Sequence, residues 1–206
     1  MPQIKSKERV RDLAEVYTNE REVKAMLDLI PLKNEDEIIK YRYLEPACGN
    51  GNFLTEILAR KLCRVNQKYG EKPLTVFEFN IIRSLSSIYG IDICTNNVLE
   101  AIERLYTQVK SFFDLHKGGY IPSTGFFETV RWILENNIVV GDSINKPGDI
   151  FFFEYQTKGK QFQRVKYCYV DLIENREPTK LEVLPYENYA SIGLKLLGIK
   201  QLEMEL

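Results

Sequence analysis

The stretch Tyr43-Leu44-Glu45-Pro46-Ala47-Cys48-Gly49-Asn50-Gly51-Asn52-Phe53 decides the fold of this chain. Its pattern predicts a strand that ends on an acid, a Gly-x-Gly turn, and a helix from about Phe53. Gly49 and Gly51 allow the backbone to turn sharply and to lie close to a ligand, where a Cβ would be in the way. Glu45 stands at the carboxyl end of the strand, which is the ligand crevice of an open α/β sheet.

The acid beside the turn narrows the class of ligand. Pyrophosphate cradles usually avoid an acid at this place, because two anions would face each other. A carboxylate suits a ligand with a cationic or hydroxyl-rich end, and S-adenosylmethionine has both, in its α-amino group and its ribose. A nicotinamide dinucleotide fits less well, because Leu54 occupies the third glycine position of the G-x-G-x-x-G pattern.

Two further strands are predicted, at Ile88–Ile93 and at 137–140, and each ends near an acid, Asp92 or Asp142. Helical spacing of apolar residues predicts helices after the Gly turn, over 76–87, after Asn96 or Asn97, and over 126–135. The alternation of strand and helix predicts an α/β fold with a Rossmann-like, doubly wound and mostly parallel sheet.

The chain divides into three expected segments. Residues 1–35 form an N-terminal helical segment, with a short polar helix over 5–15 and with Asn19 as the N-cap of a second helix. Residues 36–150 form the Rossmann-like core. Residues 151–206 form a β-hairpin turning at Lys158-Gly159-Lys160, a strand over 167–173 and a C-terminal tail of partly helical character, which complete the sheet or dock a partner.

Glu45, Asp92 and Asp142 are expected to converge, because the carboxyl ends of parallel strands meet at one edge of a sheet. Their carboxylates could accept hydrogen bonds from an amine, a ribose diol and an adenine amino group. Each acid taken singly is equally well explained as a helix cap or a solvated loop residue. The three together, beside a glycine turn, favour a ligand site.

Composition excludes several classes of protein. A chain of 206 residues fits one domain, and its net charge of -1 provides no basic field for tight, non-specific DNA binding. No membrane span or signal peptide is visible. The cysteines are widely spaced without C-x-x-C and only His116 could join them as a ligand, so no metal is expected. A reduced, cytoplasmic protein fits best.

At this point the pattern resembles a known family. The string 45–53 is similar to motif I of the S-adenosylmethionine-dependent adenine-N6 DNA methyltransferases of restriction-modification systems. Residues 17–27 resemble motif X, Gly90-Ile91-Asp92-Ile93 resembles motif II, and 137–143 resembles motif III, in the gamma order of that family. The resemblance covers roughly residues 15 to 145, and its most specific part is motif I.

The resemblance implies a role for each matching residue. Tyr17 and Thr18 would hold the methionine end of the cofactor, and Asp92 would bind the ribose hydroxyls. Asp142, followed by Ser143, would accept from the adenine amino group. The remaining cofactor contacts would come from the first turn and from two apolar side chains, Glu45, Pro46, Ala47, Cys48, Gly49, Asn50, Gly51, Phe53 and Ile93.

The family's catalytic turn, Asn/Asp/Ser-Pro-Pro-aromatic, is missing, since the chain contains no Pro-Pro pair. Its catalytic residues are therefore unknown. The chain could be the cofactor-binding part of a split enzyme whose second subunit supplies catalysis and DNA recognition. It could be a degenerate relative that binds cofactor without transferring methyl groups. It could also use an unfamiliar turn, such as Glu174-Asn175.

Single features of the sequence allow other interpretations. A non-enzymatic interaction protein that keeps the glycine turn only for its fold remains an alternative. Cys48 at a helix N-terminus could be a nucleophile, but a small residue chosen for fit is favoured. The basic residues of the hairpin, mixed with aromatic ones, could contact DNA, or they could be a solvated rim: Lys158, Lys160, Arg164 and Lys166.

Overall fold

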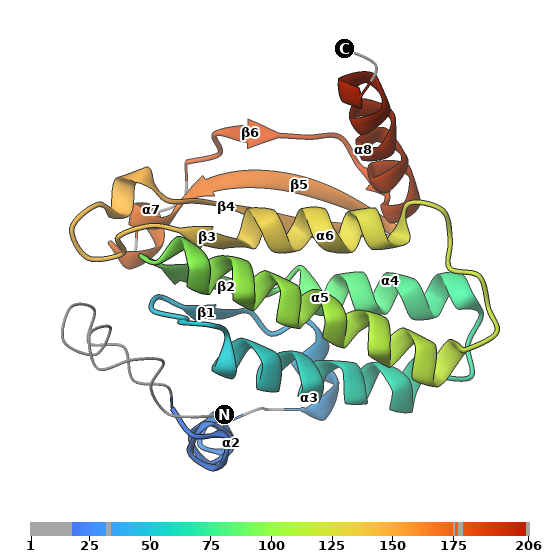
Figure 1. The fold of residues 1–206 in the computed structure, drawn as a ribbon, viewed down its shortest axis with the longest axis horizontal. Coiled ribbons are helices and arrows are strands. Elements are labelled where there is room, and N and C mark those ends of the chain that lie inside the picture. Colours follow the sequence, from blue (N-terminus) through green and yellow to red (C-terminus); the bar gives the residue numbers. More distant parts are fainter. Residues whose placement is uncertain (1–17, 32–33, 175, 177–178, 205–206) are drawn as a thin grey trace.

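A computed structural model describes residues 18–31, 34–174, 176 and 179–204. It has an α/β fold with a small parallel sheet and a C-terminal antiparallel sheet (Figure 1). Its elements are α2 (Glu20–Asp28), η1 (Glu35–Ile39), β1 (Tyr43–Glu45), α3 (Asn52–Tyr69), α4 (Leu74–Leu85), β2 (Ile88–Asp92), α5 (Thr95–Lys117), α6 (Phe126–Asn137), β3 (Ile138–Val140), η2 (Pro147–Asp149), β4 (Phe151–Lys158), β5 (Gln161–Cys168), α7 (Tyr169–Ile173), β6 (Glu182–Val183), β7 (Glu187–Asn188) and α8 (Tyr189–Met204).

The parallel sheet has the order β1-β2-β3, so each strand lies beside the next one along the chain. Glu45 of β1 is level with Gly90 of β2, and Asp92 of β2 is level with Val140 of β3. The strands therefore run in the same direction and end near one another. The predicted strand positions are confirmed to within one or two residues, as is the helix that begins beside Phe53.

The two faces of this sheet are covered differently. On one face Gly90 lies against Leu54 of α3 and Cys48, at the main apolar core that α3, α4, α5 and α6 build. On the other face Tyr89 and Ile91 pack against Ile150, Phe152 and Tyr169, so part of the C-terminal region covers it. The sheet is thus a layer between helices and an antiparallel hairpin. The carboxyl ends of its three strands lie at one edge of this layer, which we call the rim.

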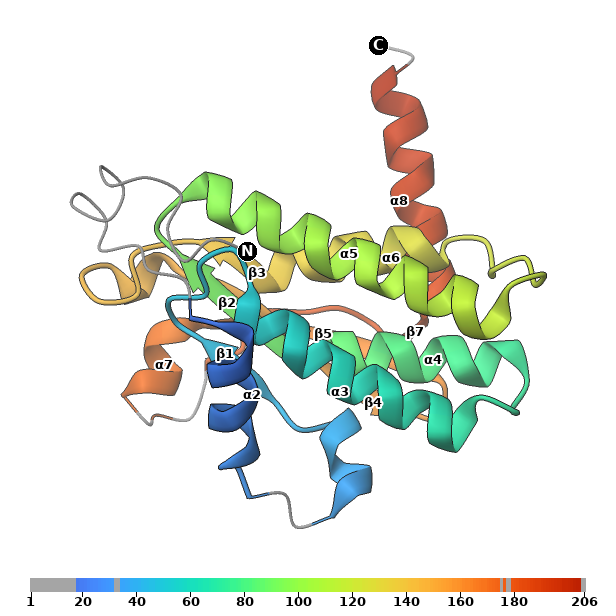
Figure 2. The ribbon, with the colours of Figure 1, turned by 60° about the horizontal axis from the view of Figure 1, so that its bottom comes forward.

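The N-terminal segment reaches the core through α2. Asn19 is its N-cap as predicted, with its side chain accepting from the backbone N–H of Arg21 at 3.0 Å. Val23 and Leu27 are buried, and Arg60 of α3 pairs with Asp28 at 2.8 Å. Figure 2 shows α2 lying beside the start of α3. The helix predicted over 5–15 lies outside the described residues.

The C-terminal region begins with the predicted hairpin. β4 and β5 pair antiparallel from Phe151↔Cys168 to Lys158↔Gln161, and Gly159 turns with a φ of 59°. The strand predicted over 167–173 is wrong beyond Cys168, because Tyr169–Ile173 forms the short helix α7. The Glu174-Asn175 turn therefore follows a helix, not a strand, and Asn175 itself lies outside the described residues.

The last helix, α8, docks at its first turns and then points away from the rest of the structure (Figures 1 and 2). Buried Glu78 of α4 accepts 2.5 Å hydrogen bonds from the hydroxyls of Tyr189 and Ser123. Thr129 of α6 donates to the Tyr189 carbonyl at 2.6 Å. In the part of the chain described, no helix is long and apolar enough to cross a membrane.

Candidate functional site

The glycine turn is held in a conformation that needs glycine. Gly49 and Gly51 have φ values of 53° and 88°, in the left-handed region that L side chains rarely adopt. A Cβ on Gly51 would lie 3.0 Å from the Cβ of Ala101 on α5. The turn is therefore pressed between the start of α3 and the side of α5, which fixes its backbone.

Asp92 ties the turn to the end of β2. One carboxylate oxygen, Oδ2, accepts from the N–H of Gly49 at 2.9 Å. The other, Oδ1, accepts from the N–H of Cys94 at 2.8 Å and from the Asn97 side chain at 3.3 Å. The glycine turn after β1 and the acid at the end of β2 are thus in direct contact. A carboxylate has about four acceptor positions, so three donors leave Oδ2 with capacity for one more.

The loop after β3 also reaches the first turn. Ser143 donates its hydroxyl to the carbonyl oxygen of Pro46 at 2.9 Å. Asp142 lies beside it, but its carboxylate accepts from Ile144 N–H, Asn145 N–H and the Asn145 side chain. Those donors from Asn145 lower the pKa of Asp142. Asp142 therefore organises its own loop, as the capping interpretation expects.

Thr18 comes to the same place, because its carbonyl accepts from the Asn52 side chain at 3.2 Å. Residue 17, predicted with it, lies outside the described residues. Thr18 and residues at or after the ends of all three parallel strands therefore meet around one turn. Phe53 is half-buried, with its ring packed against the main core.

Sequence reasoning missed the side of α5 that holds the turn. Arg104 donates to the Asn50 carbonyl at 2.6 Å and to the Asn52 side-chain oxygen at 2.9 Å. Glu100 accepts from the Asn50 amide at 2.7 Å. The sequence does indicate that these residues share one face of the helix, because Asn97, Ala101 and Arg104 fall at positions i, i+4 and i+7.

Glu45 is the acid with the most unused acceptor capacity. It is half-buried, and its carboxylate accepts one long hydrogen bond, of 3.4 Å, from the Ala47 N–H. Cys48 beside it is buried. Burial and the nearby carboxylates of Asp92 and Glu45 raise the pKa of the Cys48 thiol to about 12. A neutral thiol is a poor nucleophile, so Cys48 acts here as a small packing residue.

Exposed apolar side chains flank these acids. Ile93 follows Asp92 and is 63% exposed, while Ile144 follows Ser143 and is 85% exposed. Val140, the last residue of β3, is 49% exposed. Apolar residues this exposed at the carboxyl end of a sheet offer a surface on which a flat ring could pack.

Glu45, Asp92 and Asp142 line none of three cavities found among the described residues, although one of these cavities borders Glu100 and Arg104, which hold the glycine turn. Within the described ranges, no three His, Cys, Asp or Glu side chains gather in a way that could hold a metal ion.

The basic hairpin predicted as a DNA surface does not present its four charges together. Arg164 is buried, pairs with Glu187 at 2.8 Å and lies 4.8 Å from the centre of the Trp132 ring. Its role is to hold β5 against β7 and α6.

No protein-family model, curated protein or solved structure matches the chain.

Proposed function

We propose that this chain binds S-adenosylmethionine at the carboxyl ends of its three parallel strands. It would do so as the cofactor-binding subunit of an adenine-N6 DNA methyltransferase of a restriction-modification system. The observation that carries the proposal is the meeting of three loops at one glycine turn. The Asp92 carboxylate accepts a hydrogen bond from the Gly49 N–H, and the Ser143 hydroxyl donates to the Pro46 carbonyl. The Asn52 side chain donates to the Thr18 carbonyl.

The residues at this rim fit the cofactor's chemistry. The nearly unused carboxylate of Glu45 suits the cationic α-amino group, since a charged hydrogen bond there would cost the protein no bond of its own. The remaining acceptor position of Asp92 suits a ribose hydroxyl. The exposed side chain of Ile93 suits the adenine ring. When bound, the cofactor supplies the electrophilic methyl group.

Asp142 takes a different part in this proposal. Its carboxylate already accepts from three donors in its own loop, so it shapes that loop and leaves adenine recognition to the loop backbone and Ile144. Ser143 then fixes the loop over the first turn. The predicted direct contact between the Asp142 carboxylate and the adenine amino group is the weakest of the expected cofactor contacts.

The proposal includes a second chain. The described residues supply three parallel strands, with β1 at one edge and no described strand beyond it. A doubly wound, Rossmann-like methyltransferase sheet would continue from that edge. A partner polypeptide would supply the further strands, the Pro-Pro-aromatic turn that holds the flipped adenine, and DNA recognition. The neighbouring reading frame is the first place to look for that turn.

Calorimetric titration of the full chain with S-adenosylmethionine tests the cofactor site. We expect saturable binding, weakened roughly tenfold or more in Glu45→Gln, because a charged hydrogen bond contributes about 1.5–3 kcal/mol. Glu135→Gln, which removes an exposed acid from α6, is the matched control and should bind as the wild type does. Absence of binding at millimolar cofactor would remove the proposal.

A DNA assay with methyl-labelled cofactor tests the need for a partner. We expect no incorporation by this chain alone and incorporation when the polypeptide carrying the catalytic turn is added. Incorporation by the chain alone would refute the split arrangement.

A second candidate function is a structural or interaction protein with this fold and no cofactor. The hydrogen bonds of Asp92 and Asp142 favour this candidate, because each carboxylate accepts mainly from residues that follow it closely in the chain, such as Cys94 and Ile144. The same titration separates the two functions, since this candidate binds no cofactor at any concentration.

A further inference from the structure

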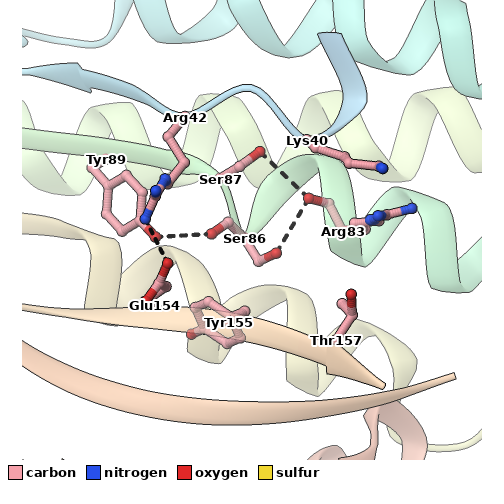
Figure 3. Close-up of a pocket in the computed structure, with 9 residues that line it drawn as sticks. All are labelled: Lys40, Arg42, Arg83, Ser86, Ser87, Tyr89, Glu154, Tyr155 and Thr157. Carbon is pink, nitrogen blue, oxygen red and sulfur yellow. Dashed lines mark hydrogen bonds and ion pairs between the residues drawn. The ribbon is translucent and has the colours of Figure 1, made fainter. Parts of the chain in front are cut away.

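A polar cavity lies at the end of the parallel sheet opposite to the glycine turn, where β2 begins. It has a volume of about 190 Å³ and lies between the link from η1 to β1, the end of α4 and strand β4 (Figure 3). Its lining is rich in cations and hydroxyl groups: Lys40, Arg42, Arg83, Ser86, Ser87, Tyr89, Glu154, Tyr155 and Thr157. It is separate from the glycine turn, which lies at the other end of β2.

The charges in this cavity are not balanced. Arg42 pairs with Glu154 at 2.5 Å, and these two residues neutralise each other. Lys40 and Arg83 have no hydrogen-bond or ion-pair partner for their charged groups among the residues that the structure describes. In the view of Figure 3 the side chains of Lys40 and Arg83 both lie on the side of the cavity away from Glu154. Two cations whose charge no described acid neutralises therefore line this cavity.

Arg83 is partly desolvated in this position. Its guanidinium is half-buried, and burial lowers its pKa because the charged form loses water. An anion bound beside this guanidinium would offset the cost of its partial burial.

Hydroxyl groups complete the surroundings of the two cations. In Figure 3 the Thr157 hydroxyl points from β4 toward the guanidinium of Arg83. Tyr155 also lines the cavity, but its hydroxyl is buried and has no hydrogen-bond partner, so it takes no part in the proposed site.

We propose that this cavity binds a phosphate group, held by the fork of Arg83, the ammonium of Lys40 and the hydroxyl of Thr157. Planar guanidinium matches two oxygens of a tetrahedral oxyanion, and lysine adds a point charge. The cavity volume equals roughly six water molecules, which is room for a phosphate ion with some of its hydration. This site does not depend on the proposed cofactor function, because it uses none of the same residues.

Binding of inorganic phosphate tests the proposal directly. The full chain is titrated with sodium phosphate at constant ionic strength, with sodium chloride as the balancing salt, and followed by calorimetry and by thermal unfolding. We expect saturable binding and a rise in Tm that chloride does not produce. Arg83→Gln and Lys40→Gln should each weaken phosphate binding roughly tenfold, as expected for the loss of one charged hydrogen bond.

Two further variants keep the test decisive. Lys110→Gln removes an exposed cation from α5 and should bind phosphate as the wild type does. Thr157→Val keeps the shape of the side chain and removes the hydroxyl, so it should fold normally and bind phosphate several-fold more weakly. Phosphate and chloride having equal effects on the wild type, or unchanged binding in Lys40→Gln and Thr157→Val, would overturn the proposal.

The source of the phosphate is settled by a second ligand. A short DNA duplex is titrated in the presence and absence of saturating phosphate. Competition that disappears in Lys40→Gln would assign the cavity to a phosphodiester of DNA. Phosphate binding without competition would assign it to a free phosphate or phosphate monoester. Either result supports the site, and failure of the cofactor titration would leave both untouched.

Discussion

The hydroxyl of Ser143 donates a hydrogen bond of 2.9 Å to the carbonyl oxygen of Pro46, 97 positions earlier in the chain. These residues follow strands β3 and β1, which are not neighbours, because β2 lies between them. The bond therefore bridges the end of β2, where Asp92 lies. It makes the three loops one structural unit, and their mutual position depends on side chains as well as on the sheet.

Ser143→Ala removes this bridge. We expect a loss of about 0.5–1.5 kcal/mol in the free energy of unfolding, the usual contribution of one hydrogen bond. On the proposed function, S-adenosylmethionine binding should also weaken several-fold, since the loop over the site loses its anchor. Chemical denaturation and calorimetric titration measure the two effects. Ser143→Thr keeps the hydroxyl and should preserve both properties; equal cofactor affinity in all three proteins would show that the bridge does not shape the site.

Gly51→Ala tests whether the turn needs glycine. Gly51 has a φ of 88°, and an added Cβ would lie 3.0 Å from the Cβ of Ala101. We expect a loss of about 1–3 kcal/mol, because a left-handed conformation strains any residue with a Cβ. Gly148→Ala is the matched control, since its added Cβ meets nothing within 4 Å and its φ is not positive. Thermal unfolding that ranks the two variants equally would contradict this account of the turn.

Local chemistry explains which features could be predicted from sequence. Asn19 caps α2, Gly51 turns the chain into α3, and Asp92 ends β2, each as expected from residue type and spacing. The convergence of the strand ends follows from parallel topology. These predictions depend on interactions between residues close in sequence or on a general property of α/β sheets.

The features that escaped prediction depend on distant contacts. Lys61 lies in the α3 sequence like a solvent-exposed residue, yet it is fully buried, where its ammonium donates to the carbonyls of Ile38 and Tyr41. The helix at 169–173 replaces the end of a strand predicted from its β-branched and aromatic residues. There, buried Tyr169 packs on Phe152 and Asp171 accepts from the Thr179 N–H. Tertiary packing decides such positions.

Lys61 gives a pH-dependent prediction. Its ammonium donates to the carbonyls of Ile38 and Tyr41, at 2.8 and 2.7 Å, and to Ser87 at 2.8 Å. Burial lowers its pKa to about 7 from an ordinary value of 10.5. Between these values the unfolded chain holds a proton that the folded chain has lost. Stability from this residue therefore rises as pH increases from about 7 toward 10.

Lys61→Met tests this rise. The variant should lose about 2–4 kcal/mol at pH 9, because two buried carbonyls lose their donor. The difference in unfolding free energy between wild type and variant should shrink as pH falls from 9 to 6. Comparing the two proteins at each pH cancels the ionisation of tyrosines and cysteines. Lys110→Met, at an exposed position, should show no such trend; a pH-independent difference for Lys61→Met would mean that its ammonium stays charged throughout.

Gly193→Ala tests how α8 is attached. A Cβ at residue 193 would lie 1.8 Å from the backbone oxygen of Gly125, so the two chain segments touch without a side chain between them. Alanine favours helix more than glycine does, and propensity alone predicts a gain of about 1 kcal/mol. The steric conflict is with backbone and cannot be relieved by a rotamer change. We therefore expect a net loss of about 2 kcal/mol or more, with α8 displaced from α6.

The control for this variant lies two residues earlier on the same helix. Ser191 is exposed, so Ser191→Ala gains helix propensity without a clash and should leave stability unchanged or slightly higher. Hydrogen exchange of the first turns of α8 should accelerate in Gly193→Ala and not in Ser191→Ala. If both variants were equally protected and stable, contact between Gly193 and Gly125 would not hold α8. The Tyr189 hydrogen bond to Glu78 would then be the main attachment, and Tyr189→Phe would be the variant that releases the helix.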